Sequence, residues 1–315
     1  MKATPRLSAA LLGATSWLCA CGTPRSTPAD AIGALGAVSA EPPSRAAPAK
    51  PTAGGLSPQA QLGKQLFFDK RLSASGNMSC ATCHDPEHAY GPVNGLAVQL
   101  GGPKLDRPGT RAVPSLRYKE YTPAYADLLD NPDGISAPGP GGGFTWDGRA
   151  NTLAEQAKAP LLSPLEMANE TGADVVNKVL ASPYAPLFQQ VLGPNGAHDA
   201  DAAFELVVTA LQAFQLEDVS FHPYTSKFDL YAGNKLGGAL TPAELRGFNV
   251  FSDPKRGNCS SCHYQGPGLN GSSGLYTDFS YEAIGAPRNP EVAANADEEY
   301  FDLGLCGPAR GDHVP

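Results

Sequence analysis

The chain has 315 residues, which allows about two domains of ordinary size. Hydrophobic residues make up 42% of it, enough for a packed core, and no apolar run reaches the roughly 18 residues of a membrane-spanning helix. The formal net charge of −8 and the pI of about 5.2 argue against a nucleic-acid partner, which would need a basic surface.

The first 21 residues have the layout of an export signal. Lys2 and Arg6 supply the positive start, and residues 7–18 form a short apolar stretch. Residues 18–21, LCAC, resemble a bacterial lipobox, in which Cys21 becomes the lipid-modified first residue of the mature chain. Cleavage of an ordinary secretory signal nearby is the alternative, and both alternatives predict export.

Residues 22–55 are rich in Pro, Ala, Gly and Ser and show no apolar periodicity, so we expect a disordered tether. Two or more acyl chains on Cys21 would hold the protein at a membrane surface without spanning the bilayer. The sequence therefore predicts a periplasmic lipoprotein whose folded body begins at residue 56.

A repeat opens the folded body and returns late in the chain. LSPQAQLGKQLFFD begins at Leu56 and LTPAELRGFNVFSD begins at Leu240, with matching Gly, aliphatic, Phe and Asp positions. Ser57 and Thr241 are predicted helix N-caps, each followed by Pro at the first helical position. Each helix leads through a short loop into a C-x-x-C-H pentapeptide. The repeat indicates two copies of one small helical unit.

The pentapeptides CATCH and CSSCH raise three chemical alternatives. A redox dithiol would sit in a βαβ setting, which the sequence lacks, and a zinc site would bring its two Cys pairs within about 15–20 residues. Covalent haem accounts for both thiols, which bond to the porphyrin, and for the imidazole, which ligates its iron. The sequence therefore predicts two haem c groups, with the anchors Cys80, Cys83, Cys259 and Cys262 and the iron ligands His84 and His263.

Between the two copies the pattern is mostly helical. One helix is expected across residues 201–216, with a shared apolar face of Phe204, Val207, Val208, Leu211 and Phe214. A shorter helix is indicated by Val175, Val176, Val179 and Leu180. We predict a mainly α fold of two cytochrome c-like haem domains with long ordered loops, the first over residues 56–230 and the second over residues 231–315.

A protein with two haems can be a simple electron carrier. The segment 144–169 contains the residues that favour an enzyme instead. Glu166 lies next to an apolar turn, and a carboxylate held there over a haem face suits proton transfer, because burial raises its pKa toward working pH. Each residue of interest also has a plainer interpretation. Trp146 could be core, Gln156 a helix-surface amide and Glu166 a solvated acid.

Together with both haem motifs, this segment resembles the bacterial di-haem cytochrome c peroxidase family, which includes the MauG-like enzymes. The resemblance runs from about Leu56 to the end of the chain. It rests on LGKQLFFDKRLS, CHDP, WDGRA-x-TL-x-x-QA, P-L-E-M and the second C-x-x-C-H, in that order. It implies an N-terminal peroxidatic domain and a C-terminal electron-transfer domain, which takes electrons from a small cytochrome c or cupredoxin.

The resemblance also implies roles for three residues. Glu166 would transfer the protons of hydrogen peroxide as the O–O bond breaks, and Gln156 would orient the peroxide by hydrogen bonding. Trp146 would relay electrons between the two haems. A calcium ion between the domains and a homodimer are further implications, to which the resemblance assigns no residues here.

The sequence departs from the family pattern in two places. The loop after the first motif, AYGPVNGLAVQLGGPKL, contains no histidine to ligate the first iron, so we expect five-coordinate iron as in the MauG-like branch. A MauG-like oxidase acting on another substrate, and a plain electron-transfer cytochrome, are therefore alternatives to the peroxidase. Family members also continue beyond the position of Pro315, so we expect a truncated C-terminal domain. His198 and His222 have no motif around them and are expected in ordinary surface or loop positions.

Overall fold

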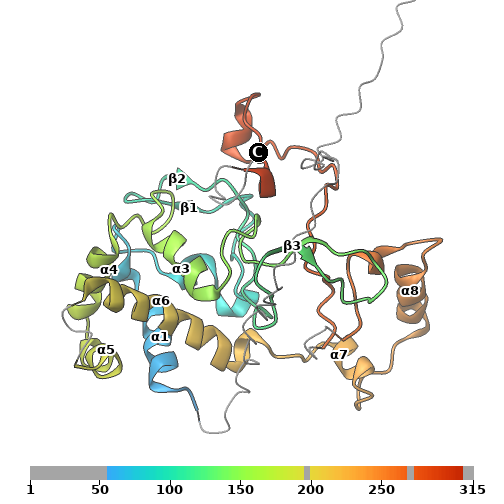
Figure 1. Cartoon of the computed structure of the whole chain (residues 1–315), viewed down its shortest axis with the longest axis horizontal. Coiled ribbons are helices and arrows are strands. Elements are labelled where there is room, and N and C mark those ends of the chain that lie inside the picture. Colours follow the sequence, from blue (N-terminus) through green and yellow to red (C-terminus); the bar gives the residue numbers. More distant parts are fainter. Residues whose placement is uncertain (1–54, 195–198, 268–272, 308–315) are drawn as a thin grey trace, which may run out of the picture. The chain divides into compact units, whose positions relative to one another are not determined.

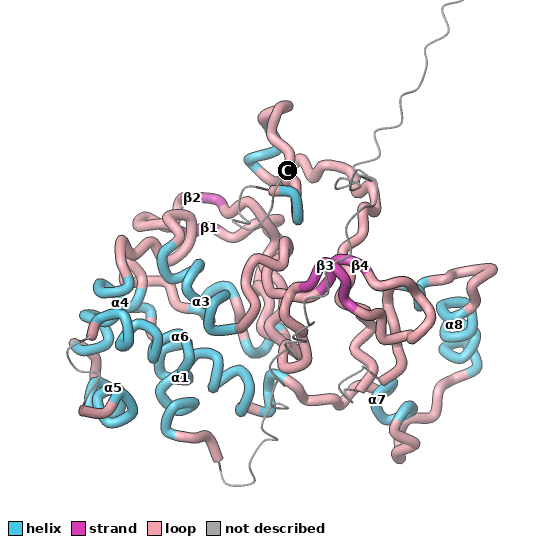
Figure 2. The backbone as a smooth tube through the Cα atoms, viewed as in Figure 1, coloured by secondary structure: helices cyan, strands magenta, loops and turns pink. Residues whose placement is uncertain are grey.

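Helices and irregular loops form nearly all of the protein that its structure, a computed structural model, describes: residues 55–194, 199–267 and 273–307. Strands in these ranges are confined to two short antiparallel pairs (Figures 1 and 2). The prediction of a mainly α fold is confirmed. Within the same ranges no helix is both long and apolar enough to cross a membrane. The predicted signal with Cys21, and the predicted tether up to residue 54, lie outside the described residues.

The elements follow one another with long loops between them. The α-helices are α1 (Pro58–Phe68), α2 (Cys80–Cys83), α3 (Leu153–Leu162), α4 (Gly172–Leu180), α5 (Ala185–Leu192), α6 (Ala200–Glu217), α7 (Lys227–Ala232) and α8 (Pro242–Ser252). The 3-10 helices are η1 (Lys70–Leu72), η2 (Pro86–His88), η3 (Val219–Phe221), η4 (Cys259–Ser261), η5 (Ala293–Ala296) and η6 (Gly304–Cys306). Strand β1 (Leu100–Gly101) pairs with β2 (Arg107–Pro108), and β3 (Ala126–Leu129) pairs with β4 (Gly139–Gly141).

Both predicted caps of the repeat are confirmed. Ser57 Oγ accepts a hydrogen bond from the Ala60 N–H at 3.1 Å, at the start of α1. Thr241 Oγ1 accepts from the Glu244 N–H at 3.3 Å, and Glu244 in turn accepts from the Thr241 N–H at 2.7 Å. These side chains satisfy N–H groups that the first turn of a helix leaves without a partner.

The first copy of the repeat packs tightly against α6 (Figure 1). A Cβ atom at Gly63 would lie 1.9 Å from the Ala210 carbonyl oxygen, so only glycine permits this close crossing of α1 and α6. Helix α6 runs one residue beyond its predicted range at each end and buries Val207, Val208, Leu211 and Phe214. Phe204 is only partly buried there.

Helix α4 confirms the shorter predicted helix, with one correction. Val175, Val176 and Val179 are buried, but Leu180 is 44% exposed. Leu180 is the last residue of α4, at its C-terminal end.

An aromatic cluster, defined as Phe67, Tyr90, Phe214 and Phe221, joins α1 and α6 to the loop after the first C-x-x-C-H. Phe67 makes edge-to-face contacts with the other three rings, at centroid distances of 5.5 to 6.1 Å. Tyr90 stacks on Phe221 with centroids 3.8 Å apart. Burial of four large rings stabilises this region and fixes the backbone of Tyr90.

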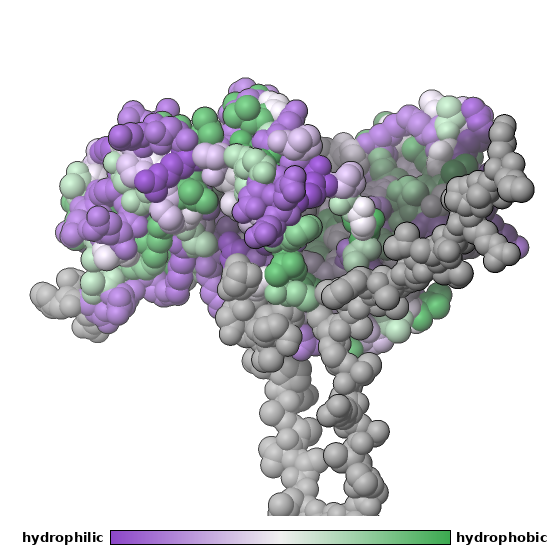
Figure 3. All heavy atoms as spheres, turned by 90° about the horizontal axis from the view of Figure 1, so that it is seen from above, coloured by the Kyte–Doolittle hydropathy of each residue, from purple (hydrophilic) through white to green (hydrophobic). Residues whose placement is uncertain are grey.

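The second copy of the repeat has a different environment. Helix α8 buries none of its side chains, and Leu245 and Val250 are 42% and 40% exposed. A Cβ atom at Gly247, the counterpart of Gly63, would meet nothing within 4 Å. Hydrophobic residues are visible among hydrophilic ones on the molecular surface (Figure 3). The described residues all belong to one compact unit, and the predicted domain boundary between residues 230 and 231 stays a prediction.

Candidate functional site

The first C-x-x-C-H forms a single helical turn. Cys80 to Cys83 make up α2, and the N–H of Ser79 before it donates to the Thr82 hydroxyl at 2.9 Å. The His84 N–H donates to the Cys80 carbonyl at 2.9 Å, which closes the turn. The two thiols and the imidazole therefore start from one short, capped segment.

The imidazole of His84 is oriented by a backbone carbonyl. Its Nδ1 lies 2.9 Å from the carbonyl oxygen of Tyr90, and because a carbonyl can only accept, Nδ1 carries the proton. Burial lowers the pKa of His84, while hydrogen bonds to the backbone of Tyr90 and of Pro114 act in the opposite direction. With Nδ1 protonated, the neutral imidazole is the tautomer in which Nε2 can bind a metal.

The second motif repeats this arrangement. The His263 N–H donates to the Cys259 carbonyl at 2.8 Å, and the His263 Nδ1 lies 3.1 Å from the carbonyl oxygen of Tyr276. Tyr90 and Tyr276 both have a φ of 57°, in the left-handed region that non-glycine residues rarely adopt. Sequence reasoning missed both tyrosines, because each contributes a backbone atom.

The thiols of the two motifs differ in their surroundings. Burial, with a smaller contribution from the negative charge of Glu166, raises the pKa of Cys80 to about 12 and that of Cys83 to about 11. Cys259 and Cys262 are exposed. Of the three predicted catalytic residues, Glu166 is therefore the one that the structure places beside the first motif.

The environment of the Glu166 carboxyl raises its pKa, although the residue as a whole is exposed. Glu166 counts as an exposed residue, yet the surrounding protein removes water from its carboxyl and raises its pKa. A hydrogen bond with Ser163 and the positive charge of Arg149 act in the opposite direction. A carboxyl with a raised pKa that a small substrate can reach is suited to proton exchange.

The backbone of Glu166 is held by two hydrogen bonds. Its N–H donates to the Ser163 carbonyl at 3.0 Å, and its own carbonyl accepts from the Gly102 N–H at 2.8 Å. Further along the same turn, the buried Asn169 amide donates to the carbonyls of Leu72 and Leu161, at 2.9 and 2.7 Å. The turn is therefore tied both to the strand β1 region and to the segment before the first motif.

Gln156 and Trp146, the other two predicted catalytic residues, do not share a cavity with Glu166 or with each other. Gln156, on α3, lines a cavity of about 430 Å³ together with Thr145 and Arg149, and neither Glu166 nor Trp146 lines it. Arg149 connects the two places, because its charge also acts on Glu166. Trp146 is 55% exposed, so it is no core residue, and its Nε1–H donates to the Ala112 carbonyl at 2.8 Å.

Comparison with known proteins identifies the family. The family model described as di-haem cytochrome c peroxidase matches residues 57–236, more than half of the chain. The chain belongs to the di-haem cytochrome c peroxidase family. The resemblance predicted from the motifs is confirmed.

Among relatives in this family, the methylamine utilization protein MauG of Paracoccus denitrificans is 35% identical over 254 residues. That match covers 78% of this chain and 62% of MauG. Cytochrome c551 peroxidase of Nitrosomonas europaea is 31% identical over 251 residues, which cover 78% of this chain and 64% of that protein. The chain thus spans a little over 60% of the length of these relatives.

A solved structure gives the same result. The di-haem peroxidase BthA of Burkholderia thailandensis has a TM-score of 0.70 and 36% sequence identity to this chain. The similarity covers 80% of this chain and 60% of BthA. The helical arrangement described above is therefore shared with a di-haem peroxidase.

Gly101 sets the position of Glu166 in this member of the family. A Cβ atom at Gly101 would lie 2.1 Å from the Leu165 carbonyl oxygen and 2.8 Å from the Glu166 Cα. Gly101→Ala is therefore expected to displace Glu166 and to lower any turnover that depends on this carboxyl by up to about 100-fold. Gly95→Ala, where a Cβ would meet nothing within 4 Å, is the matched control and should keep full turnover. Equal turnover in both variants would contradict the role given to Gly101.

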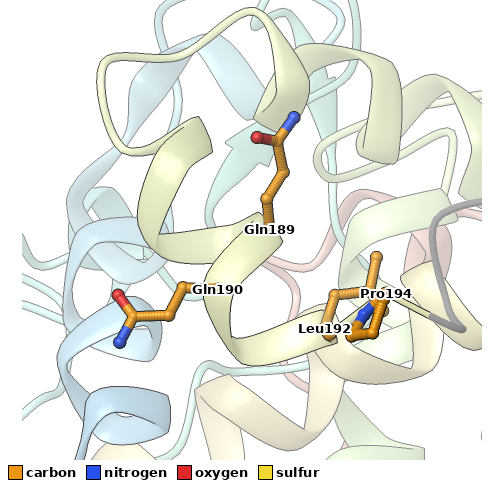
Figure 4. Close-up of a pocket in the computed structure, with 5 residues that line it drawn as sticks. Gln189, Gln190, Leu192 and Pro194 are labelled. Carbon is orange, nitrogen blue, oxygen red and sulfur yellow. The ribbon is translucent and has the colours of Figure 1, made fainter.

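A second cavity lies at the end of α5 and has no connection to these residues. It measures about 360 Å³ and is lined by Gln189, Gln190, Leu192, Gly193 and Pro194, with the two glutamine side chains pointing in different directions (Figure 4). It contains no titratable side chain and no member of the predicted site. It is not a candidate active site.

His222 differs from its expected role. It lies in a loop, as predicted, but both ring nitrogens are buried and find no hydrogen-bond partner among the described residues. It is therefore not an ordinary surface residue. His198 lies outside the described residues.

Proposed function

We propose that this protein is an exported di-haem peroxidase, which reduces hydrogen peroxide to water with electrons from a small redox protein. The observation that carries the proposal is the Glu166 carboxyl, whose pKa is raised by burial and whose charge acts on Cys80 and Cys83 of the first motif. An electron carrier has no use for an accessible proton-transfer group beside its haem anchors.

The residues of both motifs fit a haem c group. Each motif offers two thiols next to an imidazole whose Nδ1 is engaged by a backbone carbonyl, which leaves Nε2 for iron. The half-exposed apolar residues of α8 fit a large apolar ring in the second half of the chain. We assign Cys80, Cys83 and His84 to the first haem and Cys259, Cys262 and His263 to the second. The two haems supply the electron chemistry when bound.

The chain supplies proton management and orientation. Glu166 accepts a proton from one oxygen of hydrogen peroxide and returns it to the other, so that the O–O bond breaks with water as the leaving group. Gln156 donates a hydrogen bond that orients the peroxide, and the positive charge of Arg149 favours the ionised form of Glu166 that the first of these steps needs. Trp146 would serve as the electron relay between the two haem-binding motifs, as the family resemblance implies. Two electrons and two protons convert one peroxide into two waters.

A MauG-like oxidase is the second candidate. It is favoured by the 35% identity to MauG and by the position of His88, the histidine nearest in sequence to the first motif. The His88 Nδ1 lies 3.2 Å from Asp85 Oδ1 on the surface, next to the motif turn. His88 is therefore engaged by a carboxylate, and no second ligand for the first iron is offered by the following loop.

Several further assignments rest on the resemblance and on sequence pattern. We propose a periplasmic location with a lipid anchor at Cys21, a peroxidatic domain over residues 56–230 and an electron-transfer domain over residues 231–315. Calcium and a homodimer are proposed on family resemblance alone. The described residues contain no group of three or more His, Cys, Asp or Glu that could hold a metal ion.

The test is peroxide-driven oxidation of a reduced small cytochrome c by the holoprotein, after intact mass has shown two covalent haems. We expect catalytic oxidation, together with a high-spin ferric signal in electron paramagnetic resonance (EPR). Two low-spin irons and no oxidation would identify a carrier and overturn the proposal. A peroxide-induced spectral change without oxidation of the cytochrome would favour the MauG-like oxidase.

A further inference from the structure

A tyrosine cluster, defined as Tyr118, Tyr121 and Tyr224, surrounds a single carboxylate. The Tyr224 hydroxyl donates to Glu120 Oε1 at 2.8 Å across 104 residues of sequence. The rings of Tyr118 and Tyr224 lie 4.9 Å apart between centroids, at an angle of 53°. Tyr118 and Tyr121 also act electrostatically on the Tyr224 hydroxyl. None of these residues belongs to the peroxide site described above.

The fold holds two of these tyrosines in an unfavourable backbone conformation. Tyr118 has a φ of 60° and Tyr224 a φ of 44°, both in the left-handed region. Such residues persist only where the surrounding structure enforces them, and they concentrate at functional sites. The contact between the two rings is thus maintained against a local backbone cost.

A continuous series of contacts leads from this cluster to the first C-x-x-C-H. The Tyr118 N–H donates to the Phe221 carbonyl at 2.8 Å. The Phe221 ring stacks on Tyr90 at 3.8 Å, and the Tyr90 carbonyl accepts from the His84 Nδ1 at 2.9 Å. Stacked rings and hydrogen bonds are short steps for an electron between Tyr224 and the proposed first haem.

We propose that Tyr224 is a redox-active tyrosine, with Glu120 as the acceptor of its proton. With haem bound at Cys80, Cys83 and His84, Tyr224 would supply one electron to an oxidant at that site, such as peroxide. In the same step the phenolic O–H bond breaks and its proton passes to Glu120 Oε1. The products would be a neutral tyrosyl radical and a protonated Glu120, and the oxidant would take up the electron, so charge and atoms balance.

Two other tyrosines of the described residues bond to carboxylates, and their surroundings differ. Tyr184 donates to Asp69 at 2.6 Å, but Asp69 already accepts two hydrogen bonds from Arg71, both at 2.8 Å. That carboxylate is neutralised and is a poor proton acceptor. Tyr125 bonds to Asp127 on the exposed surface. Glu120 makes no ion pair within 4 Å among the described residues, so its charge is available to the Tyr224 proton.

The protonated state of Tyr224 agrees with this assignment. Burial raises the pKa of Tyr224, and the hydrogen bond and negative charge of Glu120 raise it further. The hydroxyl therefore keeps its proton at every working pH, and oxidation has to move the proton as well as the electron. A base already in contact makes that transfer possible without water.

The experiment uses the holoprotein and freeze-quench EPR after two separate oxidants. Because the proposal rests on the proposed function for its natural oxidant, one arm uses hydrogen peroxide and the other a photogenerated ruthenium(III) polypyridyl complex. We expect a tyrosyl radical signal in the unmodified protein that is largely lost in Tyr224→Phe and weakened in Glu120→Gln. Tyr184→Phe is the matched control and should keep the signal. Visible spectra would show that every variant retains its haems.

The outcomes separate the two proposals. A radical of unchanged yield in Tyr224→Phe, or no tyrosyl radical with either oxidant, would overturn the assignment. A Tyr224-dependent radical with the ruthenium complex alone would support the redox role of Tyr224 and remove support for peroxide as its natural oxidant. A radical lost equally in Tyr184→Phe would also overturn it, because Asp69 would then serve as well as Glu120.

Discussion

Replacing Glu166 by Gln is expected to lower peroxide turnover by about 100- to 10,000-fold, the usual contribution of general acid–base catalysis. The amide keeps the size of the side chain but can neither accept nor return a proton. Steady-state oxidation of a reduced small cytochrome c by peroxide measures the effect. Soret spectra before peroxide addition would show that both haems remain bound.

The pH dependence of turnover provides a second test of the role of Glu166 as a proton acceptor. Glu166 must be ionised to accept the first proton, so activity falls as pH falls through its pKa. Because burial raises that pKa, the acid limb should lie above the ordinary value of 4.5. The limb should vanish from the small residual activity of Glu166→Gln. A limb that persists unchanged in this variant would assign it to another group.

Glu155→Gln is the matched control for this substitution. Glu155 lies on α3, lines the same cavity as Gln156 and accepts a hydrogen bond from the Asn151 N–H at 2.6 Å. Glu155 is a carboxylate near the proposed site, but unlike Glu166 it is not among the charges that act on Cys80 and Cys83. Its turnover should stay near that of the unmodified protein. A loss equal to that of Glu166→Gln would contradict the specific role of Glu166.

Asp147→Ala is expected to reduce the free energy of unfolding by about 3 to 5 kcal/mol, the range for breaking a buried ion pair. Asp147 is fully buried, and its Oδ2 accepts from Arg111 at 2.8 Å and from Arg149 at 2.7 Å. Oδ1 accepts from the Thr145 hydroxyl at 2.5 Å. Removal of the carboxylate leaves two guanidinium groups without their buried partner. Urea titration of the holoprotein measures the loss.

Asp302→Ala tests the exposed end of the same network. Asp302 accepts two hydrogen bonds from Arg111, at 2.6 and 2.7 Å, but its side chain is 38% exposed. Solvent weakens such pairs, and a loss of about 1 kcal/mol or less is expected. Equal losses in the two variants would show that burial of Asp147 is not what makes it important.

The stability contributed by Asp147 should also depend on pH. Burial alone would raise the pKa of Asp147, but hydrogen bonds from Thr145 and Arg111 and the nearby positive charges hold it below the ordinary value of 3.8. A group with a lowered pKa stabilises the fold above its unfolded pKa and loses that effect as pH falls. The difference between the protein and Asp147→Ala should therefore be constant near neutrality and shrink below about pH 4.

The sequence alone determined the helix caps and the two C-x-x-C-H turns, because their hydrogen bonds join residues three or four positions apart. The caps at Ser57 and Thr241 bond to N–H groups three residues away, so the two helix starts could be predicted from the sequence. Each C-x-x-C-H closes on itself through a bond from the histidine N–H to the first cysteine carbonyl. The family followed from the order of such motifs, without any knowledge of contacts.

Only the tertiary structure decided how these local units are completed. The carbonyls that orient His84 and His263 come from tyrosines 6 and 13 residues later, and a backbone carbonyl leaves no mark in the sequence because every residue has one. Gly63 and Gly247 match in the repeat, yet only Gly63 meets a crossing helix. Glu120 reaches Tyr224 across 104 residues, and Arg111 reaches Asp302 across 191. Pairings over such separations are set by the packing of the whole chain, because local spacing does not restrict which distant groups meet.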